Sequence, residues 1–203
     1  RQIREQKAMP STTQINPDEY MNFFKEILEK GLNILHISFS SALSGSGNNA
    51  KLTAAELNET YGEQRVIVVD SLCASMGEGL LLSQAVELKK QGLGWEELAR
   101  WAEDNKLKVC HYFTVDSLFH LLRGGRVSKA SAIVGSVLGI KPILNVDDNG
   151  KLIPIDKVRG RKTSVDALLN YMVEKAATDY SGPVFISHGD SLEDAKYLAQ
   201  KIK

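Results

Sequence analysis

Hydrophobic positions along the first half of the chain change their spacing several times, and each change marks a new element. Residues 16–31 carry apolar side chains at helical spacing, with Asn16 as a cap and Pro17 at the first helical position. The apolar, β-branched runs at 33–39 and 65–70 are typical of buried strands. Each strand is followed by a loop and then a helical pattern, which predicts a parallel sheet covered by helices. The predicted helices cover 50–61, 76–91 and 95–106.

The pattern of the second half differs, with more strands and shorter helices. A hairpin is predicted around the Asp-Asp-Asn-Gly turn at 147–150, because Asn-Gly is a strong tight-turn signal. Its strands cover 142–146 and 152–158, and further strands are predicted at 108–115 and 183–187. Helices are predicted at 117–122, 129–138 (capped by Ser128), 163–177 and 192–201. The expected fold is α/β with two lobes: residues 1–105 around a parallel sheet, and residues 106–203 as a mixed lobe.

Composition narrows the class of protein and reveals an uneven charge. The 203 residues are 43% hydrophobic and 25% charged, as in a soluble globular protein. The net charge of zero disfavours a dedicated nucleic-acid binder. However, residues 1–105 carry a net charge of −5 and residues 106–203 a net charge of +5. No run of 18 apolar residues is present, so no membrane span is expected.

The two cysteines lie in apolar runs and have no metal-binding spacing. We therefore expect Cys73 and Cys110 to be reduced core residues of a cytoplasmic protein rather than partners in a disulfide. The chain begins with Arg1 and carries no signal peptide, which is compatible with a fragment. No motif for a metal or a cofactor is present.

A Ser/Gly-rich stretch at 38–47 is the strongest local signal for chemistry. It follows a predicted parallel strand and precedes a helix, the place where ligands bind in open α/β sheets. Backbone N–H groups and serine hydroxyls there suit an anion. The stretch lacks the Lys of a phosphate-binding P-loop, and Ala42 stands where a G-x-S-x-G hydrolase motif needs glycine. A polar loop that merely caps a helix is an equally good interpretation.

Other polar and basic segments have similarly open interpretations. The Ser-Thr-Thr-Gln run at 11–14 suits a carboxylate or phosphate, or is simply a linker with a cap. Asp70 and Ser71 follow the second strand and point to the same sheet edge, or cap a helix. Arginine forks suit anionic ligands or acidic partners, and otherwise form a solvated face. The basic clusters contain Arg123, Arg126, Lys129, Arg159, Arg161 and Lys162.

The four histidines are scattered along the chain. His36 is expected in the core, while His111 and His120 fall on a strand and a helix face. Only His188, at the end of a predicted strand, lies at a plausible site edge. A Ser44–His188–Asp70 hydrolase triad is thus conceivable, but spacing neither supports nor excludes it.

Taken in series, several motifs resemble those of the DegV family of bacterial fatty-acid-binding proteins. The resemblance extends from about residue 2 to the C-terminus. The motifs are Pro-Ser-Thr-Thr-Gln at 10–14, Ser-Ser-Ala-Leu-Ser-Gly at 40–45, Val-Asp-Ser at 69–71, Leu-Arg-Gly-Gly-Arg-Val-Ser at 122–128, Ile-Lys-Pro-Ile at 140–143 and Lys-Val-Arg-Gly-Arg-Lys at 157–162.

The resemblance implies that a long-chain fatty acid is buried in an apolar tunnel, with its carboxylate near the lobe interface. It assigns the carboxylate to Thr12 and Ser44, with Ser41 and Gly45 in the same loop. The basic segments supply Arg123, Arg126, Arg159 and Arg161 for the headgroup or for a fatty acid kinase that makes an acyl-phosphate for phospholipid synthesis. No catalytic residue, metal or cofactor is implied.

Two departures from the family pattern affect the expected assembly. The opening strand with its Thr-Asp-Ser-like end is absent, and Lys203 precedes the closing strand whose His meets the carboxylate. Exposed sheet edges are therefore expected, and with them pairing into a homodimer. Two alternatives stay open: a Ser-dependent acyl hydrolase or transferase with Ser44 as nucleophile, and a pure interaction module with a basic face.

Overall fold

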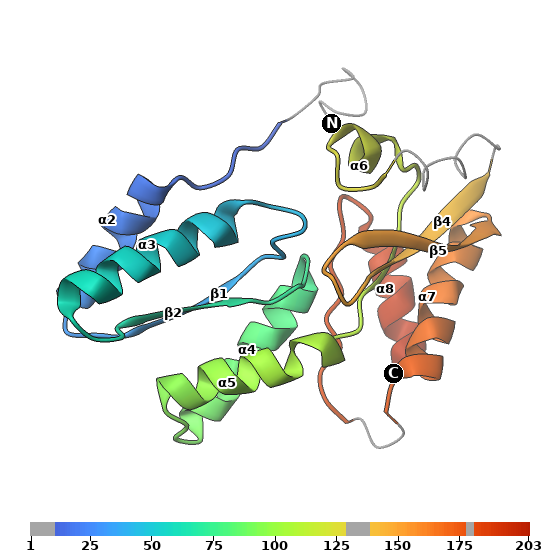
Figure 1. The fold of residues 1–203 in the computed structure, drawn as a ribbon. Coiled ribbons are helices and arrows are strands. Elements are labelled where there is room, and N and C mark those ends of the chain that lie inside the picture. Colours follow the sequence, from blue (N-terminus) through green and yellow to red (C-terminus); the bar gives the residue numbers. More distant parts are fainter. Residues whose placement is uncertain (1–10, 129–138, 178–180) are drawn as a thin grey trace.

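The chain folds into two halves, each built on its own small sheet (Figure 1). The structure is a computed structural model and describes residues 11–128, 139–177 and 181–203. The first half holds a parallel sheet, and the second half holds an antiparallel one. The expected mixed α/β fold, with a parallel sheet first and a mixed unit second, is confirmed.

Two parallel strands form the centre of the first half. Strands β1 (Ile34–Ser38) and β2 (Val66–Asp70) pair in register along their whole length. One core packs α2 (Pro17–Leu28) and α3 (Ser46–Tyr61) on one face of this sheet. A second core packs α4 (Met76–Lys90) and α5 (Trp95–Asn105) on the other face, as Figure 1 shows. Because both faces are covered, both strands are almost uniformly apolar, which explains their clear signal in the sequence.

Helix α2 begins at Pro17, as its sequence predicts. The Asn16 side chain accepts a hydrogen bond from the Glu19 N–H at 2.9 Å, and the Glu19 carboxylate accepts one from the Asn16 N–H at 3.0 Å. This reciprocal capping box satisfies two N–H groups at the helix start. The helix then buries Tyr20, Phe24 and Leu28 at helical spacing.

The predicted hairpin of the second half is confirmed. Strands β4 (Ile140–Val146) and β5 (Leu152–Arg159) are antiparallel, and β3 (Tyr112–Thr114) pairs with the other edge of β4. Helix α7 (Arg161–Lys175) packs on this sheet, and α8 (Leu192–Ile202) packs on α7.

The remaining helices are α4 (Met76–Lys90), α5 (Trp95–Asn105) and the short α6 (Phe119–Arg123). They fall close to their predicted bounds. Helix α3 begins at Ser46, four residues earlier than predicted, because the polar stretch itself winds into the first helical turn. The predicted helix 129–138 lies outside the described residues.

Two strand predictions need correction. The strand predicted at 108–115 is shorter, because a 3-10 turn at Lys106–Lys108 continues from α5. The segment 183–187 is not a strand in the structure. It runs beside the start of α4 instead, where the hydroxyl oxygens of Ser75 and Ser187 lie 3.0 Å apart. A β-branched composition makes a strand only where a neighbouring strand offers backbone partners.

Loops, rather than packed helices or strands, join the two halves. Within the described ranges, the helices and strands of one half do not pack extensively against those of the other. Three side-chain hydrogen bonds between described residues cross the junction, and one of them is the pair of Ser75 and Ser187 hydroxyls. The Ser40 hydroxyl donates to the Gly150 carbonyl at 2.8 Å, and the Arg126 Nε donates to the Leu43 carbonyl at 3.2 Å. The tip of the β4–β5 hairpin is therefore anchored on the loop that follows β1.

Gly150 is a tightly packed point of this junction. It has a φ of +74°, and a Cβ atom there would overlap the Ser40 hydroxyl and lie 3.3 Å from the Leu72 Cα. We predict that Gly150→Ala lowers the free energy of unfolding by about 2–4 kcal/mol, combining a left-handed backbone with overpacking. Urea denaturation measures this change.

Gly62→Ala is the matched control. Gly62 also has a positive φ, of +68°, but open space surrounds the position of a Cβ. The control should therefore lose only about 1–2 kcal/mol. Equal losses in the two variants would show that the hairpin tip is not held against Ser40.

Candidate functional site

The candidate site is centred on the loop between β1 and α3, at the carboxyl end of the parallel sheet. We call residues 40–44 the serine turn. Hydrogen bonds join this turn to several other parts of the chain. Besides the Ser40 and Leu43 bonds across the junction, the Ser41 N–H donates to the Asp70 Oδ1 at 3.2 Å. The turn is thus held by β2, by the β4–β5 hairpin and by the segment after α6.

Most backbone donors of the serine turn are already used inside the protein. The N–H groups of Leu43 and Ser44 donate to the Ser40 carbonyl at 3.0 and 3.1 Å, and the Ala42 N–H donates to the Ser40 hydroxyl at 3.3 Å. Of residues 40–46, only the Gly45 N–H has no protein acceptor in the described part of the chain. An anion would therefore meet side-chain donors and one N–H, not a ring of backbone amides.

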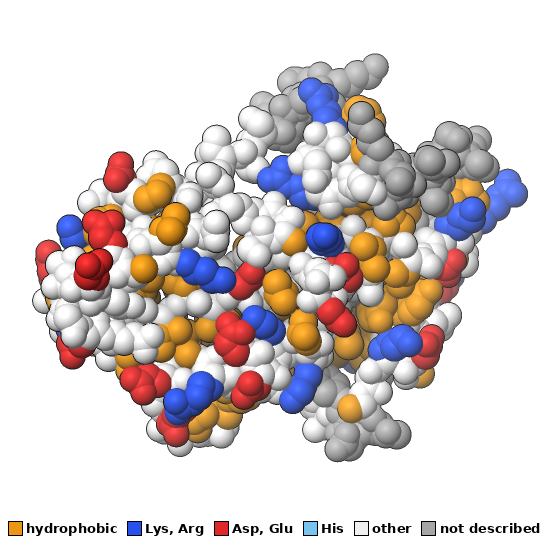
Figure 2. Space-filling model, viewed as in Figure 1, with side chains coloured by type: hydrophobic (Ala, Val, Ile, Leu, Met, Phe, Trp, Pro, Cys, Tyr) orange, Lys and Arg blue, Asp and Glu red, His pale blue; other side chains and the backbone are white. Residues whose placement is uncertain are grey.

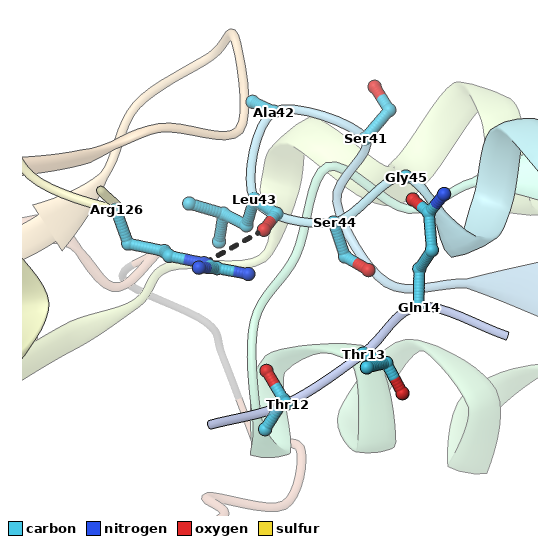
Figure 3. Close-up of a pocket in the computed structure, with 9 residues that line it drawn as sticks. All are labelled: Thr12, Thr13, Gln14, Ser41, Ala42, Leu43, Ser44, Gly45 and Arg126. Atoms are coloured by element: carbon cyan, nitrogen blue, oxygen red, sulfur yellow. Dashed lines mark hydrogen bonds between the residues drawn. The ribbon is translucent and has the colours of Figure 1, made fainter. Parts of the chain in front are cut away.

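A polar cavity of about 440 Å³ lies against this turn. Figure 3 shows the hydroxyls of Thr12 and Ser44 and the guanidinium of Arg126 pointing into the same space, while the Ser41 hydroxyl points away from it. Hydroxyl, amide and guanidinium donors suit a carboxylate or phosphate. The lining consists of Thr12, Thr13, Gln14, Ser41, Ala42, Leu43, Ser44, Gly45 and Arg126.

A second cavity of about 530 Å³ adjoins the polar one. The two share Thr12, Thr13, Leu43, Ser44 and Arg126 in their linings. The second cavity adds apolar walls from both halves of the chain, so one continuous space passes from polar to apolar surroundings. These walls are Ile15, Phe39, Ala74, Leu121 and Leu152.

Three titratable side chains also line the second cavity, and burial shifts each of them towards its neutral form. Burial raises the pKa of the Glu78 carboxyl. It also raises the pKa of Tyr20, with a further contribution from the charge of Glu78. Burial lowers the pKa of His36, whose ring packs edge-on against Tyr20 and Phe24. The interpretation of His36 as a packing residue agrees with this environment.

Five of the eight predicted ligand residues meet at the polar cavity: Thr12, Ser41, Ser44, Gly45 and Arg126. The other three arginines lie outside its lining. Arg161 forms an ion pair with Asp194, with 2.8 Å between Nε and Oδ2. Arg123 and Arg159 are exposed on α6 and at the end of β5. These three arginines lie in basic segments of the sequence, but the fold places them outside the lining of the polar cavity.

Gln14 was missed as a candidate although its motif contains it. Its side chain lies directly over Gly45, where a Cβ atom would overlap the carboxamide oxygen. Gly45 is therefore needed for close approach of the 11–14 segment, which crosses the serine turn (Figure 3). The preceding Thr12 and Thr13 reach the cavity because this segment is held there.

The hydrolase triad is not assembled in the described residues. The Ser44 hydroxyl pairs with the Ser46 hydroxyl at 3.2 Å. Asp70 accepts backbone N–H groups, and His188 Nδ1 accepts from the Ser191 N–H at 3.2 Å. The reading of Asp70 as a helix cap is also wrong, since α4 begins only at Met76. The described parts of the chain hold no cluster of metal-binding side chains and no helix long and apolar enough to cross a membrane.

The fold and cavities describe a two-part α/β protein with a ligand space at the junction of its halves. The family model that matches is described as "Uncharacterised protein, DegV family", and it covers residues 1–203. The chain belongs to the DegV family. A DegV domain-containing protein of Clostridium perfringens is 43% identical over 195 residues, which are 96% of this chain and 67% of that protein.

Two solved structures are similar in fold. A DegV family protein from Ruminococcus gnavus, refined with vaccenic acid, matches with a TM-score of 0.87 and 26% identity, over 98% of this chain and 70% of that chain. The Fatty Acid Kinase (Fak) B3 protein of Streptococcus pneumoniae, loaded with linoleic acid, matches with a TM-score of 0.79 and 26% identity, over 94% and 66% of the two chains. The chain thus spans about two thirds of the length of such relatives.

The two cysteines differ in their surroundings, which corrects one prediction. Cys73 is fully buried beside the site, where its carbonyl accepts from the Ser40 N–H at 2.9 Å. Burial raises the pKa of its thiol to about 11. Cys110, predicted in the core, is exposed. It follows the 3-10 turn after α5, before β3 begins, so its apolar neighbours in sequence are not its neighbours in space.

We predict that a thiol-specific chromogenic reagent at pH 8 labels Cys110 rapidly and Cys73 only after denaturation. The buried thiol is both inaccessible and largely protonated at that pH. A Cys110→Ser variant serves as the control, because it should show no fast phase. Fast labelling of two thiols in the native protein would contradict the packing around Cys73.

Proposed function

We propose that this protein binds a long-chain fatty acid, with its carboxylate in the polar cavity and its acyl chain in the adjoining apolar space. The observation that carries the proposal is the shared lining of the two cavities. Thr12, Ser44 and Arg126 belong to both and mark the point where polar surroundings give way to apolar ones. An amphiphile with one anionic end matches that change.

The chemistry of each end supports this ligand. The hydroxyls of Thr12 and Ser44 and the free Gly45 N–H donate to the carboxylate oxygens, and Arg126 supplies a positive charge at the rim. Hydrogen bonds to a charged group contribute roughly 1.5–3 kcal/mol each. The acyl chain gains roughly 0.8 kcal/mol per buried CH₂, so a long chain binds tightly without any catalytic residue.

The relatives support the same ligand class. The Ruminococcus gnavus and Streptococcus pneumoniae proteins are described with vaccenic acid and linoleic acid respectively. This chain spans about two thirds of the length of such proteins. The lobe boundary near Asn105, where the charge changes sign, stays part of the proposal.

A kinase partner fits the charge distribution of the second half. Arg123 and Arg159 are exposed and are not among the residues that line the polar cavity, so they are available to an acidic partner surface. In this proposal the protein acts as a carrier in the cytoplasm and presents the carboxylate to a fatty acid kinase. Homodimer formation through an unpaired sheet edge remains a separate proposal.

Catalysis by Ser44 has less support than binding. A nucleophilic serine needs a base within hydrogen-bond reach, and its described partner is the Ser46 hydroxyl. The same hydroxyl pair suits a carboxylate, because either oxygen can turn its proton to the ligand.

The proposal predicts that Ser44→Ala and Thr12→Val each weaken fatty acid binding by roughly 10- to 100-fold, the loss of one charge-assisted hydrogen bond. The measurement is displacement of a fluorescent fatty acid by oleic acid, together with mass spectrometry of lipid extracted from the purified protein. Thr60→Val is the matched control, because Thr60 is an exposed residue of α3 whose hydroxyl bonds the Glu56 carbonyl.

The wild-type protein should take up oleic acid, and the control should bind it equally well. A wild-type protein that carries no fatty acid and takes none up would contradict the proposed function. Unchanged affinity in both site variants would show that the carboxylate does not bind in the polar cavity.

A further inference from the structure

Asp70 is a buried acid that the proposed binding chemistry does not use. It is the last residue of β2 and only 8% exposed. Its Oδ1 accepts two backbone N–H groups, from Ser41 at 3.2 Å and from Leu72 at 3.1 Å. In the described part of the chain, no Lys or Arg is among its hydrogen-bond or ion-pair partners. Asp70 thus accepts the N–H of a residue that lines the proposed carboxylate site, where simple electrostatics would disfavour a second negative charge.

The two N–H groups belong to two different loops at the carboxyl end of the parallel sheet. Ser41 lies in the serine turn after β1, and Leu72 lies in the loop after β2. Leu72 has a φ of +52°, a left-handed conformation that is unfavourable for a residue with a Cβ. The hydrogen bond to Asp70 helps to hold this conformation, as Asp side chains do in turns.

The loop after β2 is also joined to the end of β1. The Ser71 hydroxyl donates to the Ser38 carbonyl at 2.7 Å, and the Cys73 carbonyl accepts from the Ser40 N–H at 2.9 Å. These bonds fix the two loops side by side but do not involve the Ser41 N–H. In the described part of the chain, Asp70 is the acceptor of that N–H.

Orientation of the Ser41 peptide determines the direction in which the next residues continue. The turn closes when the N–H groups of Leu43 and Ser44 reach the Ser40 carbonyl, and this closure places the Ser44 hydroxyl and the Gly45 N–H at the cavity. A rotated Ser41 peptide would break this arrangement. The acceptor position of Asp70 therefore matters to the site more than its charge does.

We propose that Asp70 is a positioning residue for the fatty acid carboxylate, acting by accepting the Ser41 and Leu72 N–H groups, and that its negative charge is dispensable. The inference rests on the proposed fatty acid binding. In a catalytic role, the charge of Asp70 itself would be required. In a merely structural role, its loss would weaken binding of the acyl chain as well as of the carboxylate.

The test compares Asp70→Asn, Asp70→Glu and Asp70→Ala with the wild-type protein. Asparagine keeps an acceptor oxygen at the same position without the charge, whereas glutamate keeps the charge but moves the acceptor by one methylene. We expect the Asn variant to bind oleic acid at least as tightly as the wild type. The Glu and Ala variants should bind it roughly tenfold more weakly or worse.

Oleyl alcohol is the second ligand, because it has the same chain without the anionic end. A positioning role predicts that its affinity changes less than threefold in all variants, and that exchange of the Ser41 amide hydrogen speeds up in the Glu and Ala variants but not in the Asn variant. Equal losses for the acid and the alcohol would overturn the inference in favour of a structural role. Loss of acid binding in the Asn variant would overturn it in favour of the charge.

Failure of the inference is separable from failure of the proposed function. If the wild-type protein binds neither ligand, fatty acid binding itself is wrong and the inference falls with it. If the wild type binds oleic acid and the Glu variant binds it equally well, only the role of Asp70 is wrong. Should the Ala variant not fold, the Asn and Glu pair decides the question alone, since both keep a polar side chain at this position.

Discussion

The hydrogen bond from the Ser40 hydroxyl to the Gly150 carbonyl is the interaction on which the site depends. It is buried and joins residues 110 positions apart in the sequence. The donor belongs to the loop of a parallel sheet, and the acceptor to the tip of an antiparallel hairpin. Without it, the apolar residues that the two halves contribute to the second cavity, such as Phe39 and Leu152, would not face one another. A glycine at the tip is the condition for this approach.

A second constraint is that backbone N–H groups directed into the protein need acceptors within it. The serine turn does so with its first residue, whose carbonyl and hydroxyl accept three N–H groups, and with Asp70 behind it. The result is a rigid turn with few free backbone donors, so that the hydroxyls of Ser44 and Thr12 face the cavity as the principal donors. This differs from phosphate-binding loops, whose backbone N–H groups stay available to the ligand.

The parts of the fold that were predictable are those whose cause is local. Two strands buried on both faces need continuous apolar, β-branched runs. The capping box at Asn16 depends only on residues within a four-residue segment. The predicted site residues near the serine turn belong to motifs that meet at one sheet edge, so five of them converge. Prediction from sequence failed where distant partners decide. The segment 183–187 pairs with no strand in the described ranges, and Arg161 forms an ion pair with Asp194 outside the cavity lining.

The exposed position of Cys110 illustrates the same limit. Its apolar neighbours in sequence suggested burial, but a 3-10 turn just before it changes the direction of the chain between the two sheets. Gln14 is the opposite case. Its motif is visible in the sequence, but its role depends on contact with Gly45, which lies far from it along the chain. In both cases the missing information was the path of a connecting segment, which periodicity does not encode.

A junction made of loops also has a mechanical consequence. Because the two halves share few helix or strand contacts in the described ranges, they can rotate apart as rigid bodies while each core stays packed. The hydrogen bonds between described residues that must break are those of Ser40, Ser75 and Arg126, and a neutral hydrogen bond contributes roughly 0.5–1.5 kcal/mol. Such hinge opening is far easier than unfolding a lobe, and hinge motions of this kind occur within microseconds to milliseconds. A long, flexible amphiphile can thus enter from the side, between the halves, instead of threading through a narrow mouth.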